Sequence, residues 1–166
     1  MAAPSREPKP VRLSQSEMTE IVLPNDANIV GNVLGGRVMH LVDLCGAIAA
    51  ARHSGSVAVT ASIDHMDFRF PIHIGELIVL QASVNRAFNT SMEVGVKVYA
   101  ESLLTGRRRH TSSAYLTFVA VDEHGDRISV PPVLPETEDE KRRYDKAEAR
   151  RKYRLAQRPR PTTHQD

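Results

Sequence analysis

Asp43 is the residue of this sequence whose type and surroundings point most directly to chemistry. It is the only formally charged side chain between Val38 and Ala51, where nearly every other residue is apolar. A carboxylate in apolar surroundings is costly to bury, so it either finds polar partners or has its pKa raised, and such groups are enriched in functional sites. Two interpretations stay open: a carboxylate that acts on a substrate, and a structural Asp held by a nearby hydroxyl or backbone N–H.

A pair of glycines, Gly35 and Gly36, precedes this apolar run. The N–H groups of a first helical turn have no acceptor within the helix, so they can donate to a ligand oxygen. A plain turn that enters the helix is the alternative, and for the glycines alone it is the more common case. Asp43 lies two turns further along, so a carbonyl held at the helix N-terminus could face a water that the carboxylate activates.

Asn32 carries an amide that can orient water or a carbonyl, although a turn residue is its more common role. Asn25, Asp26 and Asn28 in the same stretch are less specific still. Cys45 lies inside the apolar run, and no His is placed to activate its thiol locally. It is therefore expected to be a small buried hydrophobe and not a nucleophile.

No pattern of metal ligands is visible. His40 and Asp43 lie three residues apart, on one face of a helix, but no third ligand accompanies them and the other histidines lack ligand spacing. We therefore expect no catalytic metal. Basic residues at 107–109 and along 136–160 can meet the phosphates of a ligand, or they can form a solvated surface, which is the default.

Two hydrophobic patterns define the elements that must position these residues. The run from Gly35 to about His53 is too long for a strand and apolar on nearly every face, which predicts a helix about 27 Å long and buried all round. Other segments predict about five strands with links too short for crossover helices, hence a largely antiparallel sheet. The predicted strands are 20–23, 57–63, 77–84, 92–98 and 114–121. The result is an α+β fold whose sheet wraps around the long helix.

The two ends of the chain differ from this core. Residues 1–14 are rich in proline and charge, which predicts a flexible tail before a domain at 15–123. Residues 124–166 contain a proline-rich linker at 130–135, then a charged helix from about Glu136 to about Gln157 with acids in its first turn, and a flexible end.

The composition excludes several classes of protein. The 166 residues carry 22 Lys and Arg against 20 Asp and Glu, and a net charge of +2 is too small to indicate nucleic acid as the main partner. A single cysteine excludes an intrachain disulfide. No apolar run reaches the ~20 residues of a membrane span, and the start lacks a signal peptide's apolar centre. We expect a cytoplasmic protein that does not enter a membrane.

Six segments, taken in order along the chain, resemble the hot-dog-fold acyl-CoA thioesterases of the cytosolic acyl-CoA hydrolase and YciA type. The resemblance begins with NVLGGRVMHLVD and AIAAARH, and it continues through four shorter segments. These six segments are 32–43, 47–53, 59–64, 67–68, 71–75 and 135–141. Together they cover about residues 15–155, and the ordered combination is far more specific than any single motif.

The resemblance implies a five-stranded sheet around the long helix, an extra C-terminal helix, and homodimers that assemble into a homohexamer. The implied reaction is hydrolysis of acyl-CoA to a free acid and CoA, with no cofactor beyond the CoA of the substrate itself. Asp43 would be the general base or nucleophile, Asn32 would assist it, and the Gly36 N–H would hold the thioester oxygen. The implied substrate-binding residues, at a subunit interface, are Gly35, Asn89, Thr90 and Ser91.

Two other functions remain open for a chain of this fold. A hot-dog hydratase or dehydratase would need a His and an acid at different positions, and the absence of a matching His beside Asp43 counts against it. An acyl-CoA sensor that binds without turnover stays possible because a fold does not establish a function. The length of the acyl chain cannot be predicted, since it depends on a pocket built across subunits.

Overall fold

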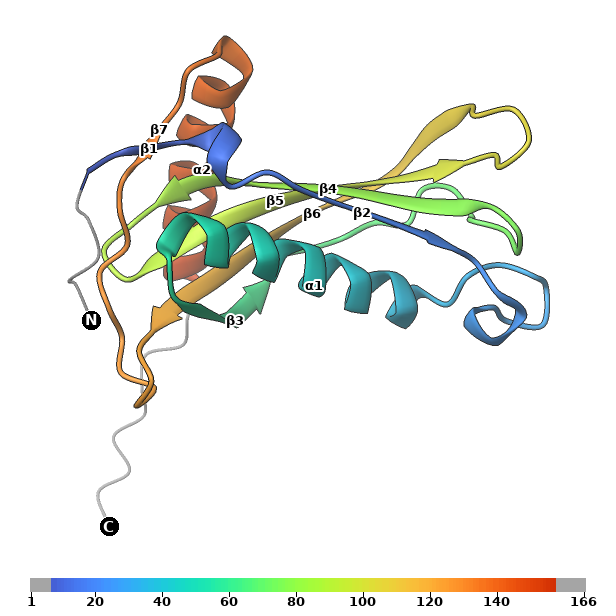
Figure 1. Ribbon diagram of the computed structural model, residues 1–166, viewed down its shortest axis with the longest axis horizontal. Coiled ribbons are helices and arrows are strands. Elements are labelled where there is room, and N and C mark those ends of the chain that lie inside the picture. The colour runs from blue at the N-terminus through green and yellow to red at the C-terminus, as the bar shows by residue number, and fades with distance from the viewer. Residues whose placement is uncertain (1–6, 158–166) are drawn as a thin grey trace.

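The computed structural model of the protein describes residues 7–157, which form seven strands and two α-helices, with short 3₁₀ helices at Val11–Leu13 and Pro24–Asp26 (Figure 1). Five strands make one sheet in the order β2, β4, β5, β6, β3, and every neighbouring pair is antiparallel. Their bounds are β2 Ser16–Ile21, β3 Val57–Ile63, β4 Leu77–Ala87, β5 Ser91–Glu101 and β6 Arg108–Val121.

The long helix α1, Gly35–Ser54, lies along one face of this sheet (Figure 1). Its inward side chains, such as Leu41 and Cys45, are fully buried, because they pack against the apolar face of the strands. Gly46 allows the helix to approach β6 closely, since a Cβ there would lie 3.1 Å from the ring of Phe118. The predicted hot-dog fold, a five-stranded antiparallel sheet around a long helix, is confirmed.

The outer side of α1 corrects the expectation of a helix buried all round. Met39, Leu44 and Ile48 are 40–41% exposed. The sheet covers only one side of the helix, so an all-round apolar sequence leaves apolar side chains on the other side facing out. An exposed apolar helix face of this kind is typical of a contact surface.

The segment before the sheet is more ordered than its composition predicts. Strand β1 (Lys9–Pro10) pairs in parallel with β7 (Val133–Leu134), and Val11 is 2% exposed. The predicted flexible tail is therefore wrong for residues 7–14, and residues 1–6 lie outside the described part of the chain. Proline is tolerated in β1 because β1 and β7 are only two residues long each and form a separate sheet outside the main one.

The first strand of the main sheet lies earlier than predicted, since β2 begins at Ser16 and ends at Ile21. Ser16 is buried, and its hydroxyl donates to the backbone oxygen of Cys45 at 2.8 Å. A polar side chain therefore occupies an inward position, which interrupts the apolar alternation by which strands are found in a sequence.

The predicted charged helix is confirmed as α2, Glu138–Ala156, which crosses the sheet on the face away from α1 (Figure 1). A capping box closes its first turn: Thr137 Oγ1 accepts from the Glu140 N–H, and the Glu140 carboxylate accepts from the Thr137 N–H. The end predicted to be flexible, from 158 onward, lies outside the described residues. Within residues 7–157, neither helix is apolar enough along its length to cross a membrane.

Candidate active site

Asp43 lies in the middle of α1, half-buried, on the side that the sheet leaves uncovered. Its Oδ1 accepts a hydrogen bond of 2.6 Å from Thr60 Oγ1 on β3. The ladder between β3 and β6 shifts register immediately after Thr60, and such a bulge can re-aim a side chain. Within residues 7–157, Asp43 Oδ2 has no hydrogen-bond partner, so one oxygen is positioned by the protein and the other is available.

The N-terminus of α1 offers unpaired backbone donors. No side chain caps it, and among the described residues the N–H groups of Gly35 and Gly36 meet no acceptor. Gly36 is exposed, and a Cβ at this position would have no heavy atom within 4 Å. Gly35 lies under the ring of Phe68, 3.4 Å from where its Cβ would be. The open approach to the Gly36 N–H suits a ligand oxygen.

Within one chain, however, Asp43 and Gly36 cannot act on the same atom. Seven residues of helix separate them, which corresponds to about 10.5 Å along the axis. Reacting groups must come within about 3–3.5 Å of each other. A single thioester carbonyl therefore cannot accept from Gly36 and be attacked from Asp43 of the same subunit.

Asn32 lies at the same end of α1 as the glycines and not beside Asp43. Its backbone N–H donates to Asn28 Oδ1 at 3.1 Å, and its carbonyl accepts from the Asn28 N–H at 2.8 Å. The Asn32 side chain makes no hydrogen bond within the described residues. The loop is tied to α1 by Arg37, whose Nε lies 3.2 Å from Asp26 Oδ1.

The turn predicted to bind substrate, Asn89 to Ser91, joins β4 to β5 near the C-terminal end of α1, at the other end of the molecule from Gly36 (Figure 1). Arg151 from α2 reaches this turn and donates to Ser91 Oγ at 3.4 Å. Its guanidinium also lies 4.0 Å from the centre of the Phe88 ring. Arg151 could not be assigned to the turn from the sequence, because the two are far apart in it.

Among residues 7–157, no group of three or more His, Cys, Asp or Glu side chains is arranged to hold a metal ion. Cys45 is buried, and burial is the main cause that raises the pKa of its thiol. A thiol held neutral in this way is a poor nucleophile.

A curled antiparallel sheet around one helix, with a carboxylate at mid-helix and open N–H donors at its start, defines a hot-dog-fold protein with the groups for acyl transfer chemistry. The family model described as "Thioesterase superfamily" matches residues 30–106. The chain is 43% identical over 122 residues to the acyl-CoA thioester hydrolase YkhA of Bacillus subtilis, with 74% of this chain and 71% of that one covered. It belongs to the thioesterase superfamily, among the acyl-CoA hydrolases, and is a thioester hydrolase.

Solved structures agree with this placement. A hexameric acyl-CoA thioesterase in its apo form matches with a TM-score of 0.86 and 44% identity, covering 92% of this chain and 99% of the other. The acyl-CoA hydrolase of Staphylococcus aureus, solved with butyryl-CoA, CoA and CoA disulfide, matches with a TM-score of 0.84 and 36% identity, covering 89% and 90%.

Structures of the Staphylococcus aureus hydrolase include variants with alanine in place of one Asp, one Asn and one Thr. In that enzyme the Asn precedes the Asp by 15 positions and the Thr follows it by 17. The same residue types stand at the same spacing here, as Asn28, Asp43 and Thr60. Sequence reasoning missed Thr60, because a lone threonine in a strand carries no signal, and it passed over Asn28 in favour of Asn32.

Proposed function

We propose that the protein hydrolyses fatty acyl-CoA to a free fatty acid and CoA, in the cytoplasm and without a cofactor. Asp43 is the general base or the nucleophile, Asn32 assists, and the Gly36 N–H holds the thioester oxygen. The observation that carries the proposal is the Asp43 carboxylate, in which Thr60 fixes one oxygen while the other meets no hydrogen-bond donor among residues 7–157. The butyryl-CoA and CoA bound by the Staphylococcus aureus relative support this class of substrate.

The chemistry needs only these groups and water. As a general base, Asp43 takes a proton from the water that attacks the thioester carbon; the C–S bond then breaks, and the CoA thiolate leaves with that proton. As a nucleophile, Asp43 attacks the same carbon and expels the CoA thiolate, and water then hydrolyses the resulting anhydride to the free acid and restores the carboxylate. In both cases negative charge develops on the carbonyl oxygen. An N–H at the start of a 20-residue helix faces that charge with the positive end of the helix dipole.

The 10.5 Å separation within one subunit leads us to place the site between two subunits. Gly36, Asp43, Met39 and Leu44 share the uncovered side of α1. If two copies meet about a twofold axis with their α1 helices antiparallel and the axis between Gly36 and Asp43, each Asp43 comes level with Gly36 of the other copy. Each dimer then contains two equivalent sites.

The edge strand β3 supports the same dimer. It pairs only with β6, so its other edge has unpaired backbone groups within the described residues. Val57 and Val59 on it are 64% and 46% exposed. An exposed apolar edge is a template for pairing with another strand, so β3 against β3 of a second copy would continue the sheet across the dimer. The hexameric relative supports assembly of three such dimers.

Asn28 is a second candidate for the assisting asparagine. It holds the loop by accepting from the N–H groups of Val30 and Asn32. The spacing shared with the Staphylococcus aureus hydrolase favours Asn28. The side chain of Asn32, which makes no hydrogen bond to any described residue, favours Asn32. Both lie at the end of α1 that the proposed dimer brings to the partner's Asp43.

The experiment is steady-state release of CoA thiol from a panel of short, medium and long acyl-CoAs, which also measures the preferred chain length. Turnover supports a thioesterase, whereas binding without thiol release indicates an acyl-CoA sensor. Hydration of an enoyl-CoA without thiol release would indicate a hydratase.

CoA itself should contribute to recognition, because its phosphates can meet the basic residues of this chain, Arg151 beside Ser91 among them. We therefore expect a much higher kcat/KM for an acyl-CoA than for the same acyl group on a short thiol. Equal kcat/KM values for the two thioesters would show that the CoA part is not recognised.

A further inference from the structure

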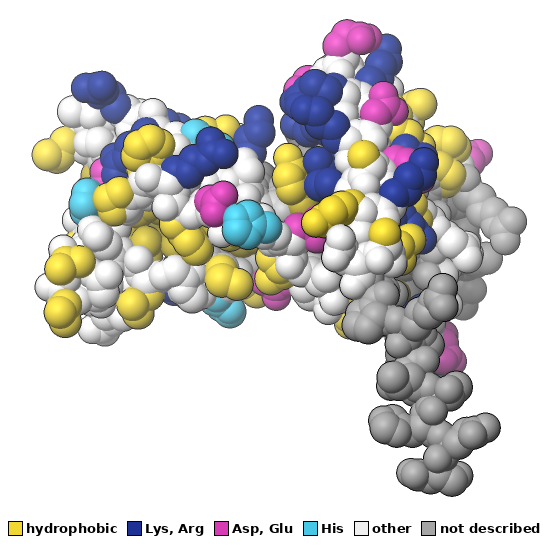
Figure 2. Space-filling model, turned by 180° about the vertical axis from the view of Figure 1, so that it is seen from behind, with side chains coloured by type: hydrophobic (Ala, Val, Ile, Leu, Met, Phe, Trp, Pro, Cys, Tyr) yellow, Lys and Arg dark blue, Asp and Glu magenta, His cyan; other side chains and the backbone are white. Residues whose placement is uncertain are grey.

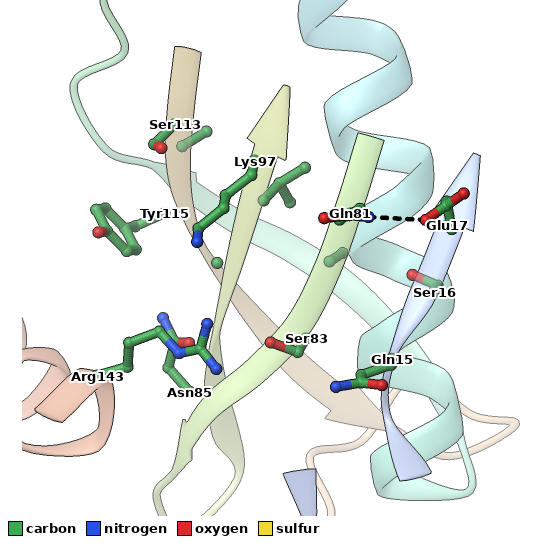
Figure 3. Close-up of a pocket in the computed structure, with 14 residues that line it drawn as sticks. Gln15, Ser16, Glu17, Gln81, Ser83, Asn85, Lys97, Ser113, Tyr115 and Arg143 are labelled. Atoms are coloured by element: carbon green, nitrogen blue, oxygen red, sulfur yellow. Dashed lines mark hydrogen bonds between the residues drawn. The ribbon is translucent and has the colours of Figure 1, made fainter. Parts of the chain in front are cut away.

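The face of the sheet away from α1 contains a hollow that the thioester chemistry does not use. It has a volume of about 360 Å³ and lies between α2 and the strands β2, β4, β5 and β6 (Figure 3). Figure 2, which views this side, shows Lys and Arg side chains gathered over α2 beside the hollowed surface. This volume falls at the lower end of the range for small-molecule sites.

The hollow is lined by polar groups where a sheet covered by a helix would normally be apolar. Gln81 and Ser83 on β4, with Ser113 on β6, present amide and hydroxyl groups to it (Figure 3). At its floor Gly95 has no side chain, and a Cβ there would lie 2.8 Å from Asn85 Nδ2. The glycine therefore leaves room for the Asn85 amide, which is itself 97% buried, being 3% exposed.

Two cations from different elements point toward the same hollow, Lys97 from β5 and Arg143 from α2 (Figure 3). Within residues 7–157, Lys97 makes no ion pair. Arg143 has one, with Asp139 at 3.2 Å. Asp139 also pairs with Arg142, and its pKa is lowered by that hydrogen bond first and by Arg143 and Lys97 in smaller part. The positive charges of Lys97, Arg142 and Arg143 therefore face a single exposed carboxylate beside the hollow, that of Asp139.

Among the described residues, Glu17 is the only carboxylate that lines the hollow, and it is engaged at the opposite side, where its Oε2 accepts from Gln81 Nε2 at 2.8 Å. The end with Lys97 and Arg143 therefore has an excess of positive charge, and the rest offers hydrogen-bonding groups beside apolar surface. This suits a ligand with an anionic group at one end and hydroxyl groups along its body.

We propose that this hollow is a binding site for a phosphate-bearing, hydroxylated small molecule, whose phosphate lies between Lys97 and Arg143. It is distinct from the thioester site within one subunit, because the sheet separates it from Asp43 and Gly36. The phosphate can belong to a free phosphorylated metabolite or to the nucleotide end of a CoA held by a neighbouring subunit. Both have the chemistry that the hollow recognises.

The probe is ribose 5-phosphate, with ribose as the control that lacks the phosphate. Calorimetric titration of the full-length protein should show binding of ribose 5-phosphate and none of ribose. Lys97→Gln and Arg143→Gln should each weaken it roughly tenfold or more, because each removes a charge-assisted hydrogen bond. Lys97→Arg should retain binding. Lys146→Gln, which removes the same charge from an exposed position on α2, should change nothing.

The source of the phosphate is decided by two further measurements. If CoA displaces ribose 5-phosphate and Lys97→Gln raises KM for acyl-CoA without lowering kcat, the site takes the phosphates of CoA. If ribose 5-phosphate binds alongside CoA and KM is unchanged, the site takes a separate metabolite. No binding of ribose 5-phosphate, or equal binding by the wild type and Lys97→Gln, overturns the proposal. Binding is measured without turnover, so the result is independent of the proposed hydrolysis.

Discussion

Thr60 donates to a single oxygen of Asp43, and this arrangement satisfies both interpretations that the sequence leaves open. A hydroxyl does hold the carboxylate, as a structural Asp would require. The second oxygen has no hydrogen-bond partner in the described part of the chain, as a general base or nucleophile would require. Substitution can separate the two roles, because an amide can accept from Thr60 but cannot take a proton from water.

Asp43→Asn should lower kcat by roughly a thousandfold or more, since the side chain loses its basicity and nucleophilicity while keeping its shape. The free energy of unfolding should change little, because the Thr60 hydrogen bond can persist. Thiol release and urea unfolding measure the two quantities. Asp145→Asn, an exposed acid on α2, is the matched control. Near-normal turnover in Asp43→Asn would show that Asp43 is structural.

The two asparagines of the loop before α1 can be separated in the same way. Asn32→Ala removes a side chain without a hydrogen bond in the described residues, so stability should be unchanged and any loss of kcat reports a role in the reaction. Asn28→Ala removes the acceptor of two backbone N–H groups, so it should lower stability by about 1–2 kcal/mol as well. If only Asn28→Ala lowers kcat, after correction for folded protein, the assisting residue is Asn28.

His53 gives the protein a pH dependence unrelated to the site. It is fully buried, its Nε2 lies 2.8 Å from the carbonyl oxygen of Pro131, and its Nδ1 is buried without a partner among residues 7–157. Because a carbonyl only accepts, Nε2 carries a proton and donates it to Pro131. Burial is the main cause that lowers the pKa of His53 below its ordinary value, with Lys9 adding to it and the Pro131 contact opposing it.

The unfolded chain therefore binds a proton that the folded chain does not, and stability is lost as the pH falls through the ordinary histidine pKa of about 6.5. The melting temperature should drop between about pH 7 and pH 5.5. In His53→Gln, which keeps an N–H donor but does not titrate, that drop should be smaller. Equal slopes for the two proteins would show that His53 is not responsible.

At the scale of elements, α2 shows where an accurate prediction from sequence stops. Its bounds follow from the capping residues and the order of charges, and the structure agrees closely. The position of α2 on the sheet could not be predicted from the sequence. The alternation of apolar and polar residues in β5 assigns Glu93 to the side of the strand that faces solvent. Glu93 is instead fully buried under α2, where Arg150 donates to both of its oxygens, at 3.0 and 2.7 Å, and Asn85 donates to one at 3.0 Å.

The buried ion pair between Arg150 and Glu93 predicts which substitution will destabilise the packing of α2 on the sheet. Arg150→Met should cost about 3–5 kcal/mol of unfolding free energy, because the Glu93 carboxylate would be left buried without its cation. Adding Glu93→Gln should recover part of the loss, since the buried charge is then gone. Lys152→Met, which removes an exposed cation from the same helix, should have little effect. Urea unfolding measures all three, and no recovery in the double variant would contradict the pairing.

At the scale of the whole molecule, the fold could be predicted largely because its pattern is local: strands alternate and one long apolar helix interrupts them. The site could be predicted only in part. The sequence predicts Asp43 and Gly36 as site residues, and a helical spacing of seven residues already separates them. The partners that meet through space, Thr60 with Asp43 and Arg151 with Ser91, are 17 and 60 positions apart and carry no local signal.

In the proposed dimer, Asp43 of one subunit and Gly36 of the other would come together. The uncovered side of α1 and the unpaired edge of β3 both belong to the surface that the dimer would bury. If the site forms there, a subunit that lacks Asp43 can still supply the asparagine and the Gly36 N–H to its partner. Mixing two inactive variants tests this directly.

Asn32→Ala and Asp43→Ala should each be inactive alone and should complement each other when their subunits are exchanged. A mixed dimer has one site that lacks both residues and one site that has both. Random exchange makes half of the dimers mixed, and half of their sites work, so roughly a quarter of wild-type activity should return. Asn28→Ala replaces Asn32→Ala if Asn28 proves to be the assisting residue.

The measurement is thiol release by dimers that mass spectrometry has verified as mixed. Activity no greater than the sum of the separate variants would mean that the two residues act within one subunit or not in one site, and the interfacial mechanism would have to be abandoned.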